Sequence, residues 1–103
     1  MREHPAIVFR DGPTGRRAGL MAGSDVWEIV RSLRDAKRHE PELTDNARIE
    51  LVATNSGMTA GQIRSAIDYY LAYPDEIDQL VRDADAAEEA ALDAWERRRA
   101  LLS

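Results

Sequence analysis

An unbroken helical pattern after Pro74 constrains the fold of this chain more than any other feature. Apolar and small residues recur along one side of the pattern, with acidic residues on the other sides. This predicted stripe consists of Ile77, Leu80, Val81, Ala84, Ala87, Ala91, Leu92 and Trp95. Pro74 suits the first turn of a helix, where Asp75 and Glu76 interact favourably with the helix dipole. A helix continuous to Leu102 is about 42 Å long, so we expect its outer half to project from a small body.

We therefore divide the chain into a body, residues 1–74, and a C-terminal helical arm, residues 75–103. A projecting helix of small apolar residues has too little surface of its own to be stable, so we expect the arm to bind a partner or to be poorly ordered when free. We expect the acidic side chains of the arm to form a solvated charged face. Arg97, Arg98 and Arg99 either compensate the dipole at the helix end or insert into an acidic pocket of a partner.

The charge of the chain is unevenly distributed. The 103 residues have a formal net charge of -5, of which residues 74–96 contribute -8 and residues 97–103 contribute +3. The acidity therefore belongs to the arm, and the nearly neutral body stays compatible with nucleic acid. A chain of this length builds one small core, which excludes a two-domain enzyme.

The first segment predicts a β-hairpin. Residues 5–9 form a short stretch with β-branched and aromatic side chains. A turn-rich stretch at residues 11–15 separates it from a second extended piece at residues 16–21. A lone hairpin is marginal in water, so we expect it to pack on the helices or to pair with another chain, which suggests a dimer.

The period changes to that of a helix after Gly23. Asp25 is a good N-cap with Glu28 three residues on, and the spacing predicts a helix from about Val26 to Lys37 that ends before Pro41. Its apolar stripe is Val26, Ile29, Val30 and Leu33. We interpret Trp27 as an aromatic residue of the core or its rim, with a partner-binding anchor as the alternative.

Two further helices are predicted between residues 45 and 73. The first begins after the cap Thr44 and stops at residues 55–57, and the second begins at Thr59, with Gln62 completing a capping box. The predicted buried stripe of the second helix is Ile63, Ala66, Ile67, Tyr70 and Leu71. Two apolar-faced helices joined by about four residues that include a glycine are typical of a helix-turn-helix. A helix pair used only for packing is the alternative.

The exposed start of the second helix supplies candidate DNA contacts. They are Thr59 for phosphate and Gln62, Arg64 and Ser65 for base edges. Because phosphate neutralisation provides most of the affinity and only Arg64 is basic, binding would need Arg10, Arg16 and Arg17, or a second copy of the chain.

The residues predict no catalytic or metal chemistry. The chain has no cysteine and two histidines without a suitably spaced partner, so we expect no metal site and no cofactor. No nucleophile motif or phosphate-binding loop is present, so we expect no enzyme. No apolar run approaches the length of a membrane span, and residues 1–5 lack the apolar segment of a signal peptide, so we expect a cytoplasmic protein without a membrane partner.

Residues 4–80 resemble the bacterial domain-of-unknown-function family number 433. The resemblance is carried by residues 4–9, 15–20, 25–30, 58–70 and 73–78, above all by the passage that ends in Tyr69-Tyr70 and continues with Pro74-Asp75-Glu76-Ile77. The family looks like a VapB-type antitoxin family with a helix-turn-helix core, often encoded beside a PIN-like ribonuclease toxin.

The resemblance and the residues together predict a mainly α fold with a short N-terminal β-hairpin, a helix-turn-helix core and a long C-terminal helical arm. The implied function is that of a type II antitoxin, which binds its operator DNA as a homodimer and neutralises a PIN-like toxin protein with its arm. The expected toxin contacts are Leu92, Trp95, Arg97, Arg98 and Arg99. A transcriptional regulator without a toxin and an interaction module that binds no DNA are the alternatives.

Overall fold

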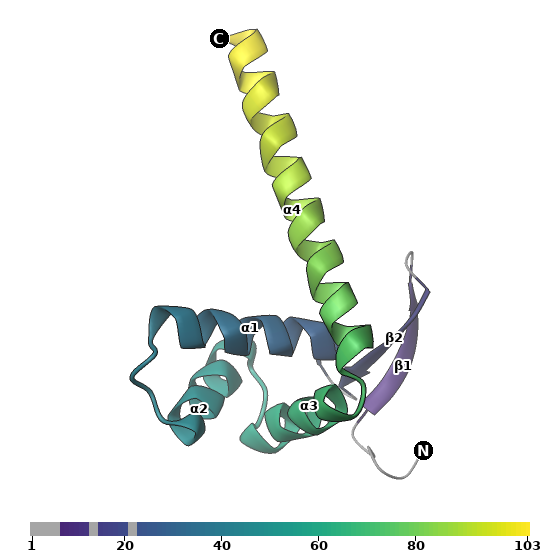
Figure 1. The fold of residues 1–103 in the computed structure, drawn as a ribbon, viewed down its shortest axis with the longest axis vertical. Helices are drawn as coiled ribbons and strands as arrows, with labels where there is room; N and C mark the ends of the chain where they lie inside the picture. Colours follow the sequence, from purple (N-terminus) through teal and green to yellow (C-terminus); the bar gives the residue numbers. More distant parts are fainter. Residues whose placement is uncertain (1–6, 13–14, 21–22) are drawn as a thin grey trace.

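The computed structural model describes residues 7–12, 15–20 and 23–103. The described part of the chain is mainly helical, with a two-stranded antiparallel hairpin followed by four helices, and this confirms the predicted fold class (Figure 1). The elements are β1 (Ile7–Gly12), β2 (Gly15–Leu20), α1 (Val26–His39), α2 (Asp45–Ser56), α3 (Ala60–Ala72) and α4 (Pro74–Leu102).

The hairpin packs on the helices, as its marginal size requires. In the register, Ile7 lies opposite Leu20. Ala18 of β2 is buried, and the ring centroid of Phe9 lies 6.3 Å from that of Tyr69 in α3, edge to face. Residues 13–14 of the predicted turn lie outside the described residues. Packing on the body is confirmed, and pairing with another chain stays a prediction.

The boundaries of α1 follow from its caps. The carboxylate of Glu28 accepts a hydrogen bond from the backbone N–H of Asp25 at 2.9 Å, as the capping box predicts. The helix continues to His39, two residues beyond the predicted end at Lys37. Proline restricts only the residue before it, so the chain leaves helical geometry at Glu40 and no earlier.

The turn between α2 and α3 has the predicted chemistry. Gly57 adopts φ 71°, the left-handed geometry that glycine tolerates best, directly after the end of α2. Thr59 then accepts a hydrogen bond from the backbone N–H of Gln62 at 3.1 Å, and the side-chain oxygen of Gln62 accepts one from the N–H of Thr59 at 2.9 Å. The capping box predicted for α3 is confirmed.

One core joins the hairpin and all four helices of the described part. Its buried apolar residues are Ala18, Val26, Ile29, Val30, Ile49, Val52, Ala53, Ile63, Ala66, Tyr69, Ile77 and Val81. Trp27 is partly buried against this core, in agreement with a rim aromatic. From α4, the core of the described residues takes the buried side chains of Ile77 and Val81, with Leu80 packed against it, so only the first turns of this helix belong to the core.

The predicted stripe of α3 is wrong at its C-terminal end. Leu71 is 69% exposed, whereas Tyr69, which the stripe omits, is 2% exposed. The buried positions Ile63, Ala66 and Tyr69 follow one another at intervals of three residues. Leu71 lies about 200° around the helix from Tyr69 and faces away from the hairpin and α4. Apolar residues occupy both positions, so only packing could distinguish them.

The outer half of α4 projects from the body, as predicted (Figure 1). The helix has 29 residues and is therefore about 44 Å long, while the longest dimension of the molecule is 53 Å. All side chains from Asp85 to Ser103 are exposed. The predicted apolar stripe is therefore buried only at its start, and Ala87, Ala91, Leu92 and Trp95 contact no core.

Candidate functional site

Arg34 of α1 joins the root of the arm to the body. Its guanidinium donates hydrogen bonds to Asp78 at 2.5 Å and to the hydroxyl oxygen of Tyr70 at 2.9 Å. The hydroxyl of Tyr70 in turn donates to the same oxygen of Asp78 at 2.9 Å. The guanidinium also lies 5.5 Å from the ring centroid of Tyr70. This closed network connects α1, α3 and α4, and so orients the arm from two sides.

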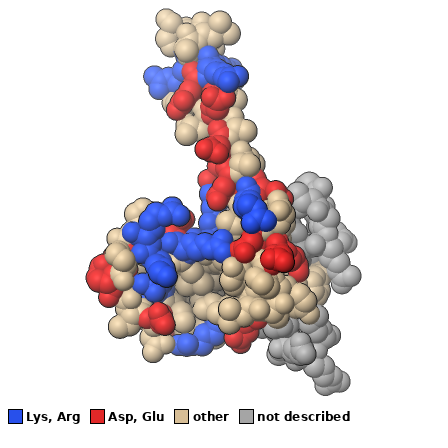
Figure 2. Space-filling model, in the orientation of Figure 1, with Lys and Arg blue, Asp and Glu red and all other residues tan. Residues whose placement is uncertain are grey.

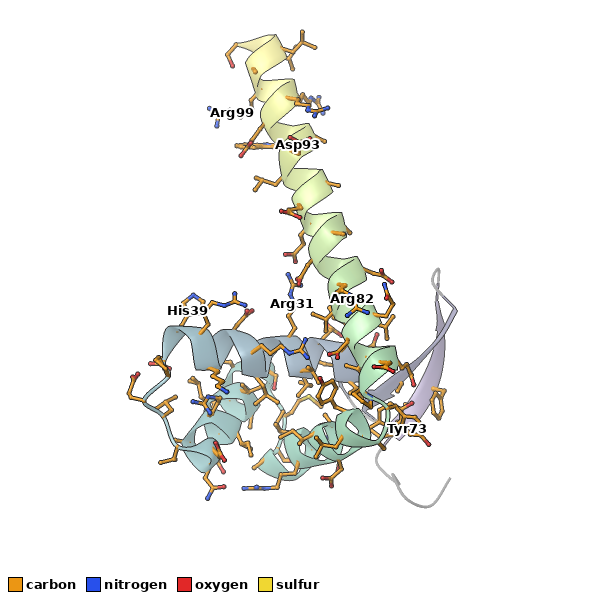
Figure 3. All side chains as sticks on the ribbon, in the orientation of Figure 1. Arg31, His39, Tyr73, Arg82, Asp93 and Arg99 are labelled. Carbon is orange, nitrogen blue, oxygen red and sulfur yellow. The ribbon has the colours of Figure 1, made fainter. Side chains whose placement is uncertain are left out.

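Arg31 makes a second connection one turn earlier on α1. Its Nε lies 3.1 Å from a carboxylate oxygen of Asp85, and its Nη2 donates to Glu88. Figure 3 shows the Arg31 side chain rising from α1 toward α4. We call Arg31, Arg34 and the acids Asp78, Asp85 and Glu88 the arginine clamp. It holds the arm to the body as far as residue 88.

Because of the arginine clamp, we expect the stability of the fold to decrease at low pH. Hydrogen bonds from Arg34 and Arg31 hold the pKa values of Asp78 and Glu88 below their ordinary values. A carboxyl with a lowered folded-state pKa stabilises the fold above its unfolded-state pKa, and this contribution is lost as the pH falls through the folded-state value. We expect the free energy of unfolding, measured by urea titration, to fall below about pH 4.

The Arg34→Met variant removes one cation of the arginine clamp, so its stability should fall less steeply with acid than that of the wild type. Arg38→Met is the matched control, because Arg38 is exposed and lies 3.5 Å from Asp35 on its own helix. Equal pH dependence in the Arg34 variant and the wild type would contradict the assignment.

Beyond the arginine clamp, the arm tip (residues 89–103) presents large apolar side chains to solvent. Leu92 is 55% exposed, Trp95 54%, Leu101 84% and Leu102 74%. Leu92, Trp95 and Leu102 lie on one side of the helix, at intervals of three and seven residues, whereas Leu101 lies on another side. The exposed leucines and tryptophan make the tip the most apolar exposed part of the arm.

The arginines of the tip differ in their surroundings. Arg99 lies over the ring of Trp95 at 4.9 Å, and Arg97 forms an ion pair with Asp93 at 3.2 Å. Arg98 lines a shallow hollow of about 400 Å³ together with Trp95, Arg99, Leu102 and Ser103. The structure thus brings Leu92, Trp95 and Arg99 of the predicted toxin contacts to one face, and turns Arg97 away from it. Figure 2 shows acids along the stem of the arm and arginines near its outer end.

The predicted DNA contacts on α3 lie at the surface, but local hydrogen bonds engage them. Gln62 is bound to the cap, as described above, and the hydroxyl of Ser65 donates to the carbonyl of Gly61 at 3.1 Å. Arg64 is exposed and donates to the side-chain oxygen of Asn46 in α2 at 3.2 Å. Ser65 and Gln62 would have to break these bonds to read a base edge.

The charge around α3 gives little help to a DNA contact. Arg64 shares a groove of about 540 Å³ with the acids Asp45 and Asp68. Arg16 and Arg17 belong to β2, and their side chains lie outside the described residues, as does that of Arg10. The described cations near the start of α3 therefore do not form a basic patch of the kind that phosphate binding requires.

Metal and membrane features are also absent from the part of the chain that the structure describes. Within residues 7–12, 15–20 and 23–103, no group of three or more His, Cys, Asp or Glu side chains is arranged to hold a metal ion. None of the described helices combines the length and the apolar character needed to cross a membrane.

In comparisons with protein-family models, curated proteins and solved structures, nothing matched this chain.

Proposed function

We propose that this protein is the antitoxin of a type II toxin–antitoxin system and that its arm binds and neutralises a PIN-like ribonuclease toxin. The observation that carries the proposal is the arm tip, where Leu92, Trp95 and Leu102 are more than half exposed on one side of a projecting helix. Contiguous exposed apolar residues rimmed by charge mark protein-binding surfaces, and tryptophan and arginine are the residues that contribute most to binding energy.

The arginine clamp supports this role, because it holds the arm at a defined angle and so reduces the ordering cost of binding. An amphipathic helix of this kind binds a groove on its partner through its apolar face. The resemblance of residues 4–80 to the domain-of-unknown-function family number 433 suggests the kind of partner. A PIN-like toxin carries an acidic metal site. An arginine among Arg97, Arg98 and Arg99 can enter this site and thereby displace the metal.

Co-expression with the product of the neighbouring gene tests this proposal. We expect the two proteins to co-purify and the complex to lack ribonuclease activity. Replacing Arg97, Arg98 and Arg99 together by alanine should weaken inhibition of the ribonuclease at least about 100-fold, as expected for the loss of several charge-assisted contacts. Arg38→Ala removes an exposed arginine from the body and serves as the control. Unchanged inhibition by the triple variant would refute the role of these arginines.

Operator binding is the second part of the proposal. It is favoured by the α2–turn–α3 arrangement with its glycine turn and by the exposure of Thr59 and Arg64 at the start of α3. Because one copy offers few cations, we propose that a homodimer binds the DNA in the cytoplasm. A mobility shift on the upstream promoter region should weaken steeply with salt and with Arg64→Ala. If no shift occurs at low salt, the protein is an interaction module without DNA binding.

A further inference from the structure

The exposed face of the arm tip has the spacing of a helix that pairs with another helix. Leu92, Trp95, Arg99 and Leu102 follow one another at intervals of three, four and three residues, as the a and d positions of a heptad do. The same face continues toward the body through Glu88 and Asp85. From residue 85 onward all side chains are exposed. At the body end of this face Asp85 and Glu88 also bind Arg31 of α1, and from Leu92 outward the face contacts nothing in the body.

The charges along this face change sign. Asp85 and Glu88 precede Leu92, whereas Arg99 follows Trp95. A second arm in the parallel direction would place acid against acid and arginine against arginine. A second arm in the antiparallel direction places Arg99 of each chain against Glu88 of the other.

We propose that two copies of this protein pair through their arm tips as an antiparallel helix dimer. Leu92 of each chain packs on the partner's Trp95 at the centre, and Glu88 contacts the partner's Arg99 on either side. Asp85 then lies beside the partner's Leu102 at each end. Every a position meets a d position of the other chain, and each contact occurs twice because of the two-fold symmetry.

The arginine clamp favours this pairing in two ways. It holds Asp85 and Glu88 in place through Arg31, and the partner's Arg99 adds a second cation beside Glu88. It also directs the tip away from the body, so that the two bodies lie at opposite ends of the paired arms. The two Ile77 residues are then about 50 Å apart along the paired arms.

This inference rests on the arm alone and not on the proposed toxin. If a toxin binds the same face, the arms must separate first, and complex formation then competes with dimer formation. The two proposals can fail separately, since dimerisation is measured with the purified protein and inhibition with the neighbouring gene product.

Analytical ultracentrifugation over a wide range of concentrations tests the pairing. We expect a reversible dimer whose dissociation constant rises at least tenfold in Trp95→Ala. Leu101→Ala is the matched control, because Leu101 is 84% exposed on another side of the same helix, and it should change the constant less than twofold. Circular dichroism verifies that both variants keep their helices. A monomer at all concentrations, or equal effects of the two substitutions, would overturn the proposal.

Cysteine cross-linking tests the direction, because the chain has no native cysteine. We expect a mixture of Glu88→Cys and Arg99→Cys chains to form disulfide-linked heterodimers on mild oxidation. Each variant alone should cross-link poorly, because identical positions are about 16 Å apart along the antiparallel pair. Strong cross-linking of Glu88→Cys with itself would show a parallel pair, and no cross-linking in any mixture would exclude this contact.

The antiparallel register brings two acids of like charge together on its flank, which provides a third test. Glu89 of each chain lies on the same flank as the partner's Glu96. Glu96→Lys should therefore tighten the dimer several-fold at low salt, with less gain at high salt. In a parallel pair Glu96 would lie beside Ala91 instead, so a lack of any gain at low salt would contradict the register.

Discussion

Replacing Tyr69 by alanine should lower the free energy of unfolding by about 3–5 kcal/mol, the usual cost of removing a buried aromatic ring. Tyr69 is 2% exposed. Its ring lies 4.8 Å from that of Tyr73 and 6.3 Å from that of Phe9, and so connects α3 with the start of α4 and with β1. A urea titration followed by circular dichroism measures the loss.

The conservative variant Tyr69→Phe separates the ring from its hydroxyl. The hydroxyl of Tyr69 donates to the two carboxylate oxygens of Glu76 at 3.2 and 3.0 Å. Burial, with the hydrogen bond to Glu76, raises the pKa of Tyr69 well above its ordinary value. Because Glu76 is exposed, the loss of this bond should cost only about 1 kcal/mol. A loss equal to that of the alanine variant would show that the bond, and not the ring, stabilises this region.

The second large effect is expected at the root of the arm. Ile77 is fully buried, and Ile77→Ala should lower the free energy of unfolding by about 2–5 kcal/mol. Since Val81 is the only other residue of α4 that is buried in the described core, with Leu80 packed against it, the loss of the Ile77 side chain should also loosen the attachment of the arm. We expect limited proteolysis to release the arm from the Ile77→Ala variant earlier than from the wild type.

Leu92→Ala is the control for Ile77→Ala, because it removes a comparable leucine side chain from the same helix. Leu92 is 55% exposed and contacts no core, so its loss should change the stability of the monomer by less than about 0.5 kcal/mol. If both variants lost the same stability at low protein concentration, the description of the arm tip as free of contacts with the body would be wrong.

The limits of the helices were predictable because their signals are local. Asp25 with Glu28 and Thr59 with Gln62 form their caps within three residues. Gly57 adopts the left-handed backbone conformation that ends α2, which depends on that residue alone. The length of the arm was predictable for the same reason. By contrast, the predicted burial of Leu71 failed, because an apolar residue carries no information about which side of α3 meets the hairpin.

The candidate site was predicted only in part. The exposed apolar tip was predictable from the helical period and from the small size of the body, which is too short to cover a helix of this length. The engagement of Gln62 and Ser65 by local hydrogen bonds could have been anticipated from the cap and from the spacing to Gly61. The arginine clamp was missed, although Arg31 and Arg34 share a side of α1. Arginines often share one side of an exposed helix without contacting acids of another helix, so this spacing alone does not predict a contact.

Caps, periodicity and composition act over a few residues, and they are enough to specify a small body and a long acidic helix with an apolar end. Which acids of α4 meet Arg31 and Arg34, and hence the angle at which the arm leaves the body, follows from the tertiary packing alone. Those partners are 44 to 57 residues apart in the chain. Their contact depends on how α1 and α4 pack around Ile77, which no local signal encodes.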